Sequence, residues 1–132
     1  MKEPAWLDQR DALALHEKLI LLHGGAPGIR DEGLLRSALA RPQQMLAYAE
    51  TPDLVAMAAA YTVGIVQNHP FVDGNKRVGF VLGVLFLEIN GFAFSASEEE
   101  AAQAVIGLAA GEIDEFAYVS FLRTNVTRRR RR

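Results

Sequence analysis

The sequence predicts an all-α fold, a compact bundle of about six helices around a buried central helix. Two observations carry this prediction: apolar residues recur at spacings of three and four along most of the chain, and two long apolar segments cover 54–66 and 78–87. Half of the 132 residues are apolar and 23% are charged, which is typical of an ordinary globular protein. We expect one domain over residues 1–127, followed by an arginine-rich tail over 128–132.

The first two helices are predicted before residue 43. Residues 8–22 carry one apolar stripe and end at Gly24 and Gly25, glycines that commonly follow a helix. A shorter helix is expected from about Leu34 until Pro42, because proline breaks the hydrogen-bond pattern of a helix interior. Residues 43–52 show no clear period, and we predict an irregular segment or a short hairpin there.

A third and a fourth helix are predicted around the two apolar segments. Asp53 is placed to cap the third helix, and Pro70 ends it near residue 69. The fourth covers about 74–90 and is apolar on every side, so we expect it to be the buried centre of the bundle. Gly79 and Gly83, four residues apart, would allow a neighbouring helix to approach closely.

The last two helices follow a short extended piece, "FAFSA", at 92–96. Ser97 and Glu100 have the spacing of a capping box for a fifth helix, which is predicted to run through Ala110, and Asp114 begins a sixth. Aromatic residues along the chain are expected in the core: Trp6, Phe92, Phe94, Phe116 and Phe121.

Composition excludes several classes of protein. There is no cysteine, which excludes disulfides, a thiolate nucleophile and a cysteine zinc site. Neither apolar run reaches the roughly 20 residues that cross a bilayer, and the first residues do not resemble a secretory signal. We therefore expect a soluble, cytoplasmic protein.

Charge is distributed unevenly along the chain. The net charge is −2, but without Arg128–Arg132 nine basic side chains face sixteen acidic ones. An acidic body argues against a broad nucleic-acid interface. The tail is predicted to be solvated and disordered, and contact of the tail with nucleic acid or an acidic partner stays open as the alternative.

The stretch "QNHPFVDGNKRVGF", residues 67–80, places polar residues between the two apolar helices. A helix start presents free backbone N–H groups and the positive end of the helix dipole, and together these bind anions. Gly74 would let a ligand approach the amides, and Lys76 and Arg77 add two cations. This combination predicts a phosphate site.

Two further residues suggest chemistry on that phosphate. Asp73 can bind Mg²⁺, which prefers one or two carboxylates together with phosphate oxygens. His69 can accept a proton from a hydroxyl near neutral pH. The set fits phosphoryl or nucleotidyl transfer. Residue chemistry alone leaves open an ordinary helix connection in which Asp73 is a cap and the cations are solvated.

The segment "HPFVDGNKR" resembles the signature of the Fic and death-on-curing (Doc) family, and the similarity extends over about residues 4–125 through "GGAPGIRDEGLLRSALARP" and "FLEINGF". The resemblance implies the Fic/Doc fold, ATP and Mg²⁺. It also implies a role for each motif residue: His69 as the base, Asp73 as the Mg²⁺ ligand, Gly74 and Asn75 as the phosphate cradle, and Arg77 as the arginine that holds phosphate.

Lys76 and Phe80 distinguish the branches of that family. Lys76 stands where the adenylylating branch has a glycine, and Phe80 stands where it has a second arginine. The lysine form is that of the death-on-curing branch, which implies a kinase that binds ATP reversed and modifies a threonine of elongation factor Tu. Val81 departs from that branch, where an asparagine can occur. A protein adenylyltransferase and a catalytically silent binding module remain the alternatives.

The resemblance also implies a toxin with a separate small antitoxin protein, since no internal inhibitory element is found. It assigns residues 43–52 as a flap that holds the target, with a plain loop as the alternative. His16 and His23 are interpreted as surface or packing residues, because no third ligand with metal spacing follows them. Tyr48 and Tyr61 are interpreted as packing residues, although either could lie near the site.

Overall fold

Residues 3–129 are described by a computed structural model, which confirms the all-α bundle. Within this part of the chain, six α-helices are accompanied by one antiparallel pair of short strands. The elements are α1 Gln9–His23, α2 Glu32–Tyr48, α3 Leu54–Asn68, α4 Asn75–Ile89, β1 Phe92–Phe94, α5 Glu98–Ala109, α6 Glu115–Thr124 and β2 Val126–Arg128. None of the described helices is both long enough and apolar enough to cross a membrane.

Five of the six helices begin at a side chain that accepts a hydrogen bond from the first-turn amides. These caps satisfy backbone donors that have no partner inside the helix. The predicted caps Asp53 and Asp114 and the predicted capping box of Ser97 and Glu100 are confirmed. The capping residues are Asp8, Asp31, Asp53, Ser97 and Asp114.

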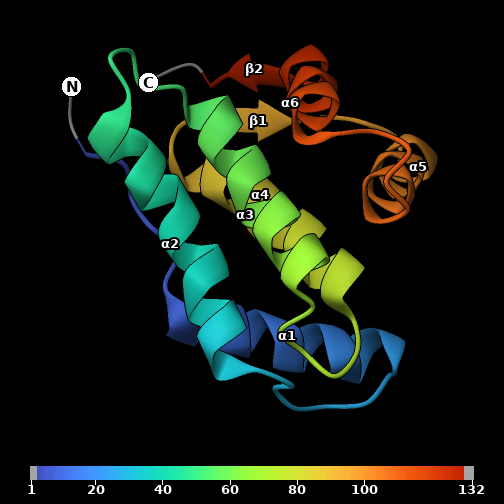
Figure 1. Ribbon diagram of the computed structural model, residues 1–132. Helices are drawn as coiled ribbons and strands as arrows, with labels where there is room; N and C mark the ends of the chain where they lie inside the picture. The colour runs from blue at the N-terminus through green and yellow to red at the C-terminus, as the bar shows by residue number, and fades with distance from the viewer. Residues whose placement is uncertain (1–2, 130–132) are drawn as a thin grey trace.

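The central helix of the bundle is α3, which corrects the expectation that 74–90 fills that place. Eleven of the fifteen residues of α3 are buried, against seven of fifteen in α4. The remaining side of α4 is only half-buried, because α5 and β1 cover it incompletely; Phe80 and Val81 lie there. Figure 1 shows α2, α3 and α4 side by side, with α1 crossing one end and the two strands at the other.

Small residues bring the backbones of α2, α3 and α4 together. A Cβ atom on Gly64 of α3 would lie 3.0 Å from the Cβ of Ala38 on α2. On the other side of α3, a Cβ on Gly83 would lie 2.8 Å from the carbonyl oxygen of Ala58, and the Thr62 hydroxyl donates to the carbonyl of Gly79 at 2.7 Å. The close approach predicted from Gly79 and Gly83 is therefore confirmed.

The prediction that Pro42 ends the second helix is wrong. α2 continues to Tyr48, with Pro42 buried inside it on the same face as Leu35 and Leu39. That face continues to the half-buried Met45, so packing against α3 outweighs the missing N–H of proline. Residues 43–48 are consequently helical, and the irregular segment is only the short connection at 49–53.

The C-terminal end of the domain also differs from the prediction. Arg128 is the last residue of β2, opposite Phe92 of β1, and the Arg129 N–H donates to the carbonyl of Gly91 at 2.8 Å. The domain therefore extends past residue 127, and the prediction of a disordered tail is wrong for Arg128. Residues 130–132 of the predicted tail lie outside the described residues.

Three predictions for aromatic residues have clear outcomes. The side chain of Phe116 is 80% exposed, which corrects its assignment to the core. Tyr61 is fully buried, and its hydroxyl pairs with the backbone of Leu7, as expected of a packing residue. Tyr48 is 89% exposed at the far end of α2, so its interpretation as a packing residue is also wrong.

Candidate active site

The motif joins α3 to α4 at the end of the bundle that α1 crosses (Figure 1). His69 follows the last residue of α3 in the left-handed conformation, with φ 51°, and this turns the chain sharply towards α4. Phe71 is fully buried and anchors the loop, while His69 and Asp73 are exposed. A hollow of about 260 Å³ lies here and is lined by His69, Val72, Asp73, Gly74, Asn75, Lys76 and Arg77. All six predicted site residues thus line one hollow.

The beginning of α4 has no side-chain cap. Gly74 occupies the cap position with φ 78°, a conformation that glycine adopts without strain. The backbone N–H groups of Asn75, Lys76 and Arg77 have no hydrogen-bond acceptor among residues 3–129. Three donors and the positive end of the α4 dipole therefore face the hollow, which is the physical arrangement of an anion site.

Asp73 is held in place by backbone donors. Its Oδ1 accepts from the N–H of Gly74 at 2.8 Å, and its Oδ2 accepts from the N–H of Ala26 at 3.2 Å. The N–H groups of Ala26 and then Gly74 lower the pKa of the Asp73 carboxyl below its ordinary value of 3.8. The carboxylate is therefore charged at neutral pH, with lone pairs left on both oxygens.

A magnesium ion fits this donor set. Asp73 contributes one exposed, charged carboxylate, and no group of three or more His, Cys, Asp and Glu side chains with metal spacing occurs among residues 3–129. A single carboxylate beside an anion site suits a cation that completes its shell with phosphate oxygens and water, which is how Mg²⁺ is usually bound.

Asn75 holds the motif loop from inside. Its side chain is buried, its Oδ1 accepts from the N–H of Phe71 at 3.0 Å, and its Nδ2 donates to the carbonyl of Phe71 at 3.0 Å. These two bonds fix the amide orientation, so the 3.1 Å contact between Asn75 Nδ2 and His69 Nδ1 makes Nδ1 an acceptor. The side chain points to the loop, and only the backbone N–H of Asn75 is available to a phosphate.

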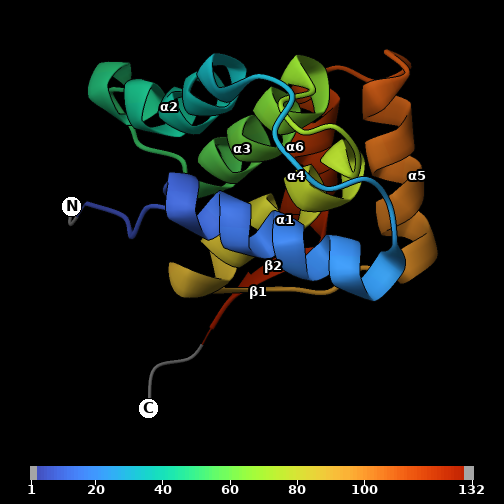
Figure 2. The same cartoon turned by 90° about the horizontal axis from the view of Figure 1, so that it is seen from below.

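Residues 24–31, between α1 and α2, cover the motif loop. Ile29 forms an isolated antiparallel bridge with Phe71, and the N–H of Val72 donates to the carbonyl of Gly28 at 3.0 Å. Figure 2 shows this segment, in cyan, passing over the connection between α3 and α4. The segment predicted as a flap, 43–52, lies instead at the opposite end of α3, where Thr51 and Asp53 share a hollow with Tyr48.

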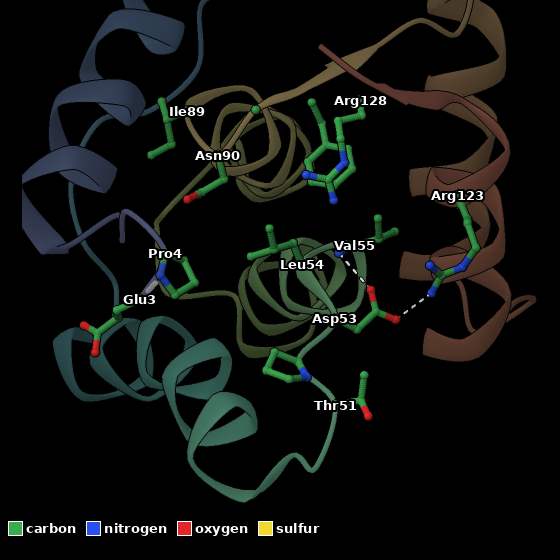
Figure 3. A pocket seen from close by; sticks show the side chains of 13 residues that line it. Glu3, Pro4, Thr51, Asp53, Leu54, Val55, Ile89, Asn90, Arg123 and Arg128 are labelled. Carbon is green, nitrogen blue, oxygen red and sulfur yellow. Dashed lines mark hydrogen bonds and ion pairs between the residues drawn. The ribbon is translucent and has the colours of Figure 1, made fainter. Parts of the chain in front are cut away.

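A larger hollow, of about 1060 Å³, also lies at that opposite end and contains none of the motif residues. Figure 3 shows Asp53 and Arg123 there, pointing towards each other, with Arg128 nearby. The carboxylate of Asp53 is already engaged by Arg123 and by the first amides of α3. The helix start at this hollow is therefore capped, whereas the helix start at the motif hollow is not.

The sequence pattern described as "Fic/DOC family" matches residues 6–87, which include the whole motif and all of α1 to α3. The chain belongs to this family. It is also 35% identical over 117 residues to the "Protein kinase doc" of Escherichia phage P1, a match that covers 89% of this chain and 92% of that protein. A "Toxin Doc" of Mycolicibacterium smegmatis is 38% identical over 92 residues, covering 69% of this chain and 68% of its own length.

In this Fic/DOC chain, sequence reasoning missed two residues that hold the motif. Arg30 donates through Nε to the carbonyl of His69 at 2.7 Å and through a terminal nitrogen to the carbonyl of Asn68 at 2.9 Å. Its cation thus lies at the negative end of α3, where it is favourable, and it fixes the backbone beside the histidine. The sequence "GGAPGIRDEG" does not predict this contact, because the contact depends on how this loop folds over the end of α3.

His16 is the second of these residues: its interpretation as a packing residue is confirmed, but its contact with the motif was not predicted. It is buried in α1, its ring stacks on Phe71 at 4.0 Å between centroids, and its Nε2 donates to the carbonyl of Asp73 at 2.9 Å. A signal existed: His16 is four residues after the buried Ala12, so a polar side chain occupies the inward stripe of α1. His23 is exposed at the end of α1, which agrees with its interpretation as a surface or packing residue.

Proposed function

We propose that this chain is a Doc-type toxin that transfers the terminal phosphate of ATP to a hydroxyl group of a protein, with Mg²⁺ as the cofactor. The observation that carries the proposal is the uncapped start of α4, flanked by Lys76 and Arg77, in one hollow with His69. The similarity over most of the chain to a protein named as a kinase supports the same activity.

In the proposed reaction, each residue has one task. The free amides of α4 hold the phosphates together with Lys76 and Arg77, whose charges also stabilise the transferring group. Asp73 would hold Mg²⁺, and the bound ion would supply positive charge that stabilises the phosphates. The hydroxyl oxygen of the target forms a bond to the γ-phosphorus. The bond between that phosphorus and the β,γ-bridging oxygen breaks, and ADP leaves. The hydroxyl proton passes to His69.

The hydrogen bond from Asn75 determines which ring nitrogen of His69 carries the proton. While Nδ1 accepts from Asn75, the neutral ring carries its proton on Nε2, the nitrogen that a target hydroxyl would have to reach. Accepting the hydroxyl proton at Nε2 requires the ring proton to be on Nδ1, and the Asn75 contact must then lengthen. We propose that target binding displaces the ring from Asn75.

For the target, we propose a threonine of elongation factor Tu, so that translation and growth stop in the cytoplasm. A separate small antitoxin protein would prevent this outcome, as expected for a relative of proteins named as toxins. Nucleic acid is not proposed as a partner of the described domain, because its body is acidic.

The experiment incubates the purified chain with elongation factor Tu, Mg²⁺ and ATP labelled at either the α or the γ phosphate. We expect transfer of the γ label alone. His69→Ala should reduce transfer by at least about a hundredfold, which is the lower range for a general base. His23→Ala is the matched control, since His23 is also exposed and lies outside the motif hollow.

Two other outcomes would contradict the proposal, and each would favour one of the alternative functions. Transfer of the α label would overturn the kinase and favour a protein adenylyltransferase. Growth arrest that persists in His69→Ala cells, but disappears when Arg128–Arg132 are deleted, would favour a silent binding module that acts through its tail.

A further inference from the structure

His69 has a backbone conformation that residues with a side chain seldom adopt. Its φ is 51°, and among residues 3–129 it is the single residue other than glycine with a positive φ. Such a conformation persists only where the surrounding structure enforces it, and it is often found where a protein positions a functional group. Contacts from elsewhere in the chain must therefore hold the backbone of His69.

The side chain and backbone of Arg30 supply these contacts. The Nε of Arg30 donates to the carbonyl of His69 at 2.7 Å, and a terminal nitrogen donates to the carbonyl of Asn68 at 2.9 Å. The backbone N–H of Arg30 donates to the carbonyl of Pro70 at 2.7 Å. Three consecutive carbonyl groups are thus bound by one residue. Because the guanidinium is planar and presents its donors in a fixed fork, it also sets the direction of these carbonyls.

The backbone of His69 in turn decides where its imidazole lies. The ring Nδ1 is 3.1 Å from Nδ2 of Asn75, and Asn75 is itself fixed by two hydrogen bonds to the backbone of Phe71. Since Asn75 cannot follow the ring, a rotation about φ or ψ of His69 would carry the imidazole away from Asn75. The position of the ring in the motif hollow therefore depends on the contacts that Arg30 makes.

The side chain of Arg30 is separate from the phosphate site. Arg30 does not line the motif hollow, whereas Lys76 and Arg77 do. Its guanidinium is instead bound to the end of α3. Any effect of Arg30 on the reaction should therefore act through His69 and not through the binding of phosphate.

We propose that Arg30 is a positioning residue, which holds His69 in the left-handed conformation and so places the imidazole against Asn75 in the motif hollow. The effect on the reaction rate rests on the proposed function, but the effect on the ring of His69 does not. Loss of the Arg30 side chain should disturb the ring and slow the transfer step, and it should leave nucleotide binding unchanged.

The first test observes the ring of His69 by NMR of the chain labelled with ¹⁵N-histidine. The chain has three histidines, so the His69→Ala spectrum identifies the signals of His69. At about pH 8.5 an ordinary imidazole is neutral, and its two nitrogens differ when one tautomer prevails. We expect the wild type to carry the proton on Nε2, and Arg30→Met to shift both nitrogens towards the average of the two tautomers. Unchanged ring signals in folded Arg30→Met would overturn the proposal.

Arg30→Met removes the side-chain donors but leaves the backbone bond to Pro70. Arg36→Met is the matched control, because Arg36 is exposed and its side chain pairs with Glu32 at 2.9 Å on the surface of α2. It should leave the ring signals unchanged. Circular dichroism checks that each variant is folded. If Arg30→Met does not fold, Arg30→Lys replaces it, since lysine keeps the charge but lacks the fork that binds both carbonyls.

The second test measures transfer of the γ label from ATP to elongation factor Tu. We expect Arg30→Met to lower kcat by at least about tenfold with KM for ATP unchanged, because a misplacement of about 1 Å can cost even more. Arg30→Lys should recover part of this loss. In a chain that already carries His69→Ala, Arg30→Met should have no further effect on the rate, as expected of a residue that acts through His69.

Two kinetic results would overturn the proposal. One is a raised KM for ATP with unchanged kcat in Arg30→Met, and the other is a further loss of rate in the double variant. A wild-type chain that transfers no γ label would overturn the proposed function instead, and the NMR result would then decide by itself whether Arg30 positions His69.

Discussion

The helices α3 and α4 have the same length and pack against each other, yet they begin in opposite ways. At the start of α3, the Asp53 carboxylate accepts from the N–H groups of Val55 and Ala56 and also pairs with Arg123 at 2.7 Å. At the start of α4, Gly74 supplies no side chain, and two cations stand nearby without an ion pair among the described residues.

The difference shows how an anion site can be made without any unusual residue. Both helix starts present the same free amides and the same dipole. At α3 the chain satisfies them itself, and this stabilises the fold. At α4 no side chain satisfies them. In the proposed function, a phosphate of ATP would bind these amides instead.

Making α4 resemble α3 should have the largest effect. In Gly74→Asp, a carboxylate at the cap position would compete for the amides and repel phosphate. A Cβ atom fits there, since its nearest contact would be Ile20 Cδ1 at 3.5 Å. We expect transfer to elongation factor Tu to fall by at least about a hundredfold, the scale of losing preorganised donors.

Gly74→Ala is the control for this change, because both variants share the cost of φ 78° at a residue with a side chain. The rate difference between the two variants then isolates the added charge. Equal rates in Gly74→Asp and Gly74→Ala would show that the open helix start does not bind the phosphates.

A smaller effect, on Mg²⁺ binding, is expected when the carboxylate of Asp73 is displaced. A Cβ atom on Gly25 would lie 2.9 Å from Asp73 Oδ2, whereas a Cβ on Gly24 would have no neighbour within 4 Å. Both glycines have positive φ, so the two alanine variants share that strain. We expect Gly25→Ala to weaken Mg²⁺ binding by about 10- to 100-fold, as when a group supporting a metal ligand is lost.

Gly24→Ala should retain the wild-type Mg²⁺ affinity, measured in the presence of ATP by titrating Mg²⁺ against the transfer rate. If both variants lost affinity equally, the cause would be strain in residues 24–31 rather than the position of the Asp73 carboxylate.

Removing the cap of α3 should affect stability and not activity. Asp53→Ala should lower the free energy of unfolding by about 1–2 kcal/mol, the usual cost of losing an N-cap, measured by urea denaturation. The transfer rate at saturating ATP should be unchanged, because Asp53 lies at the opposite end of α3 from His69. A large loss of activity in the folded variant would contradict this separation of the two helix starts.

The smallest expected effect is the pH dependence of the stability that Asp53 contributes as the N-cap of α3. Burial acts to raise the pKa of Asp53, but hydrogen bonds from Arg123 and the α3 amides outweigh it and hold the pKa below 3.8. A carboxyl with a lowered folded pKa stabilises the fold above its unfolded pKa and loses that contribution as the pH falls through the folded value. The stability difference between wild type and Asp53→Ala should thus be constant at neutral pH and shrink below about pH 3.8. A difference that grew under acid would contradict the assignment.

The sequence was a good guide where structure is decided locally. Asp53, Ser97 and Asp114 each cap a helix within three residues of themselves, and local patterns of this kind can be read directly. Pro42 shows the limit of such rules, because a buried face shared with α3 outweighs its local cost. All six motif residues line one hollow because they are close together in the chain.

What could not be predicted depends on contacts between distant residues. Arg30 and His69 are 39 positions apart, and His16 and Asp73 are 57 apart. The pairing of β1 with β2, which brings Arg128 into the domain, is of the same kind. Periodicity shows which face of an element is apolar, but it does not show which loop folds over which site.

The close packing of α2, α3 and α4 at Gly64, Gly79 and Gly83 has a consequence for which mutations inactivate the chain. At Gly83 a new side chain would meet the carbonyl of Ala58, a backbone atom that cannot move aside by changing rotamer. Even the mildest mutation there should push α3 and α4 apart, and the motif residues lie in the loop between these helices and in the first turn of α4. If the chain is toxic when expressed, survivors of a mutagenesis selection should carry lesions at these glycines as well as at His69.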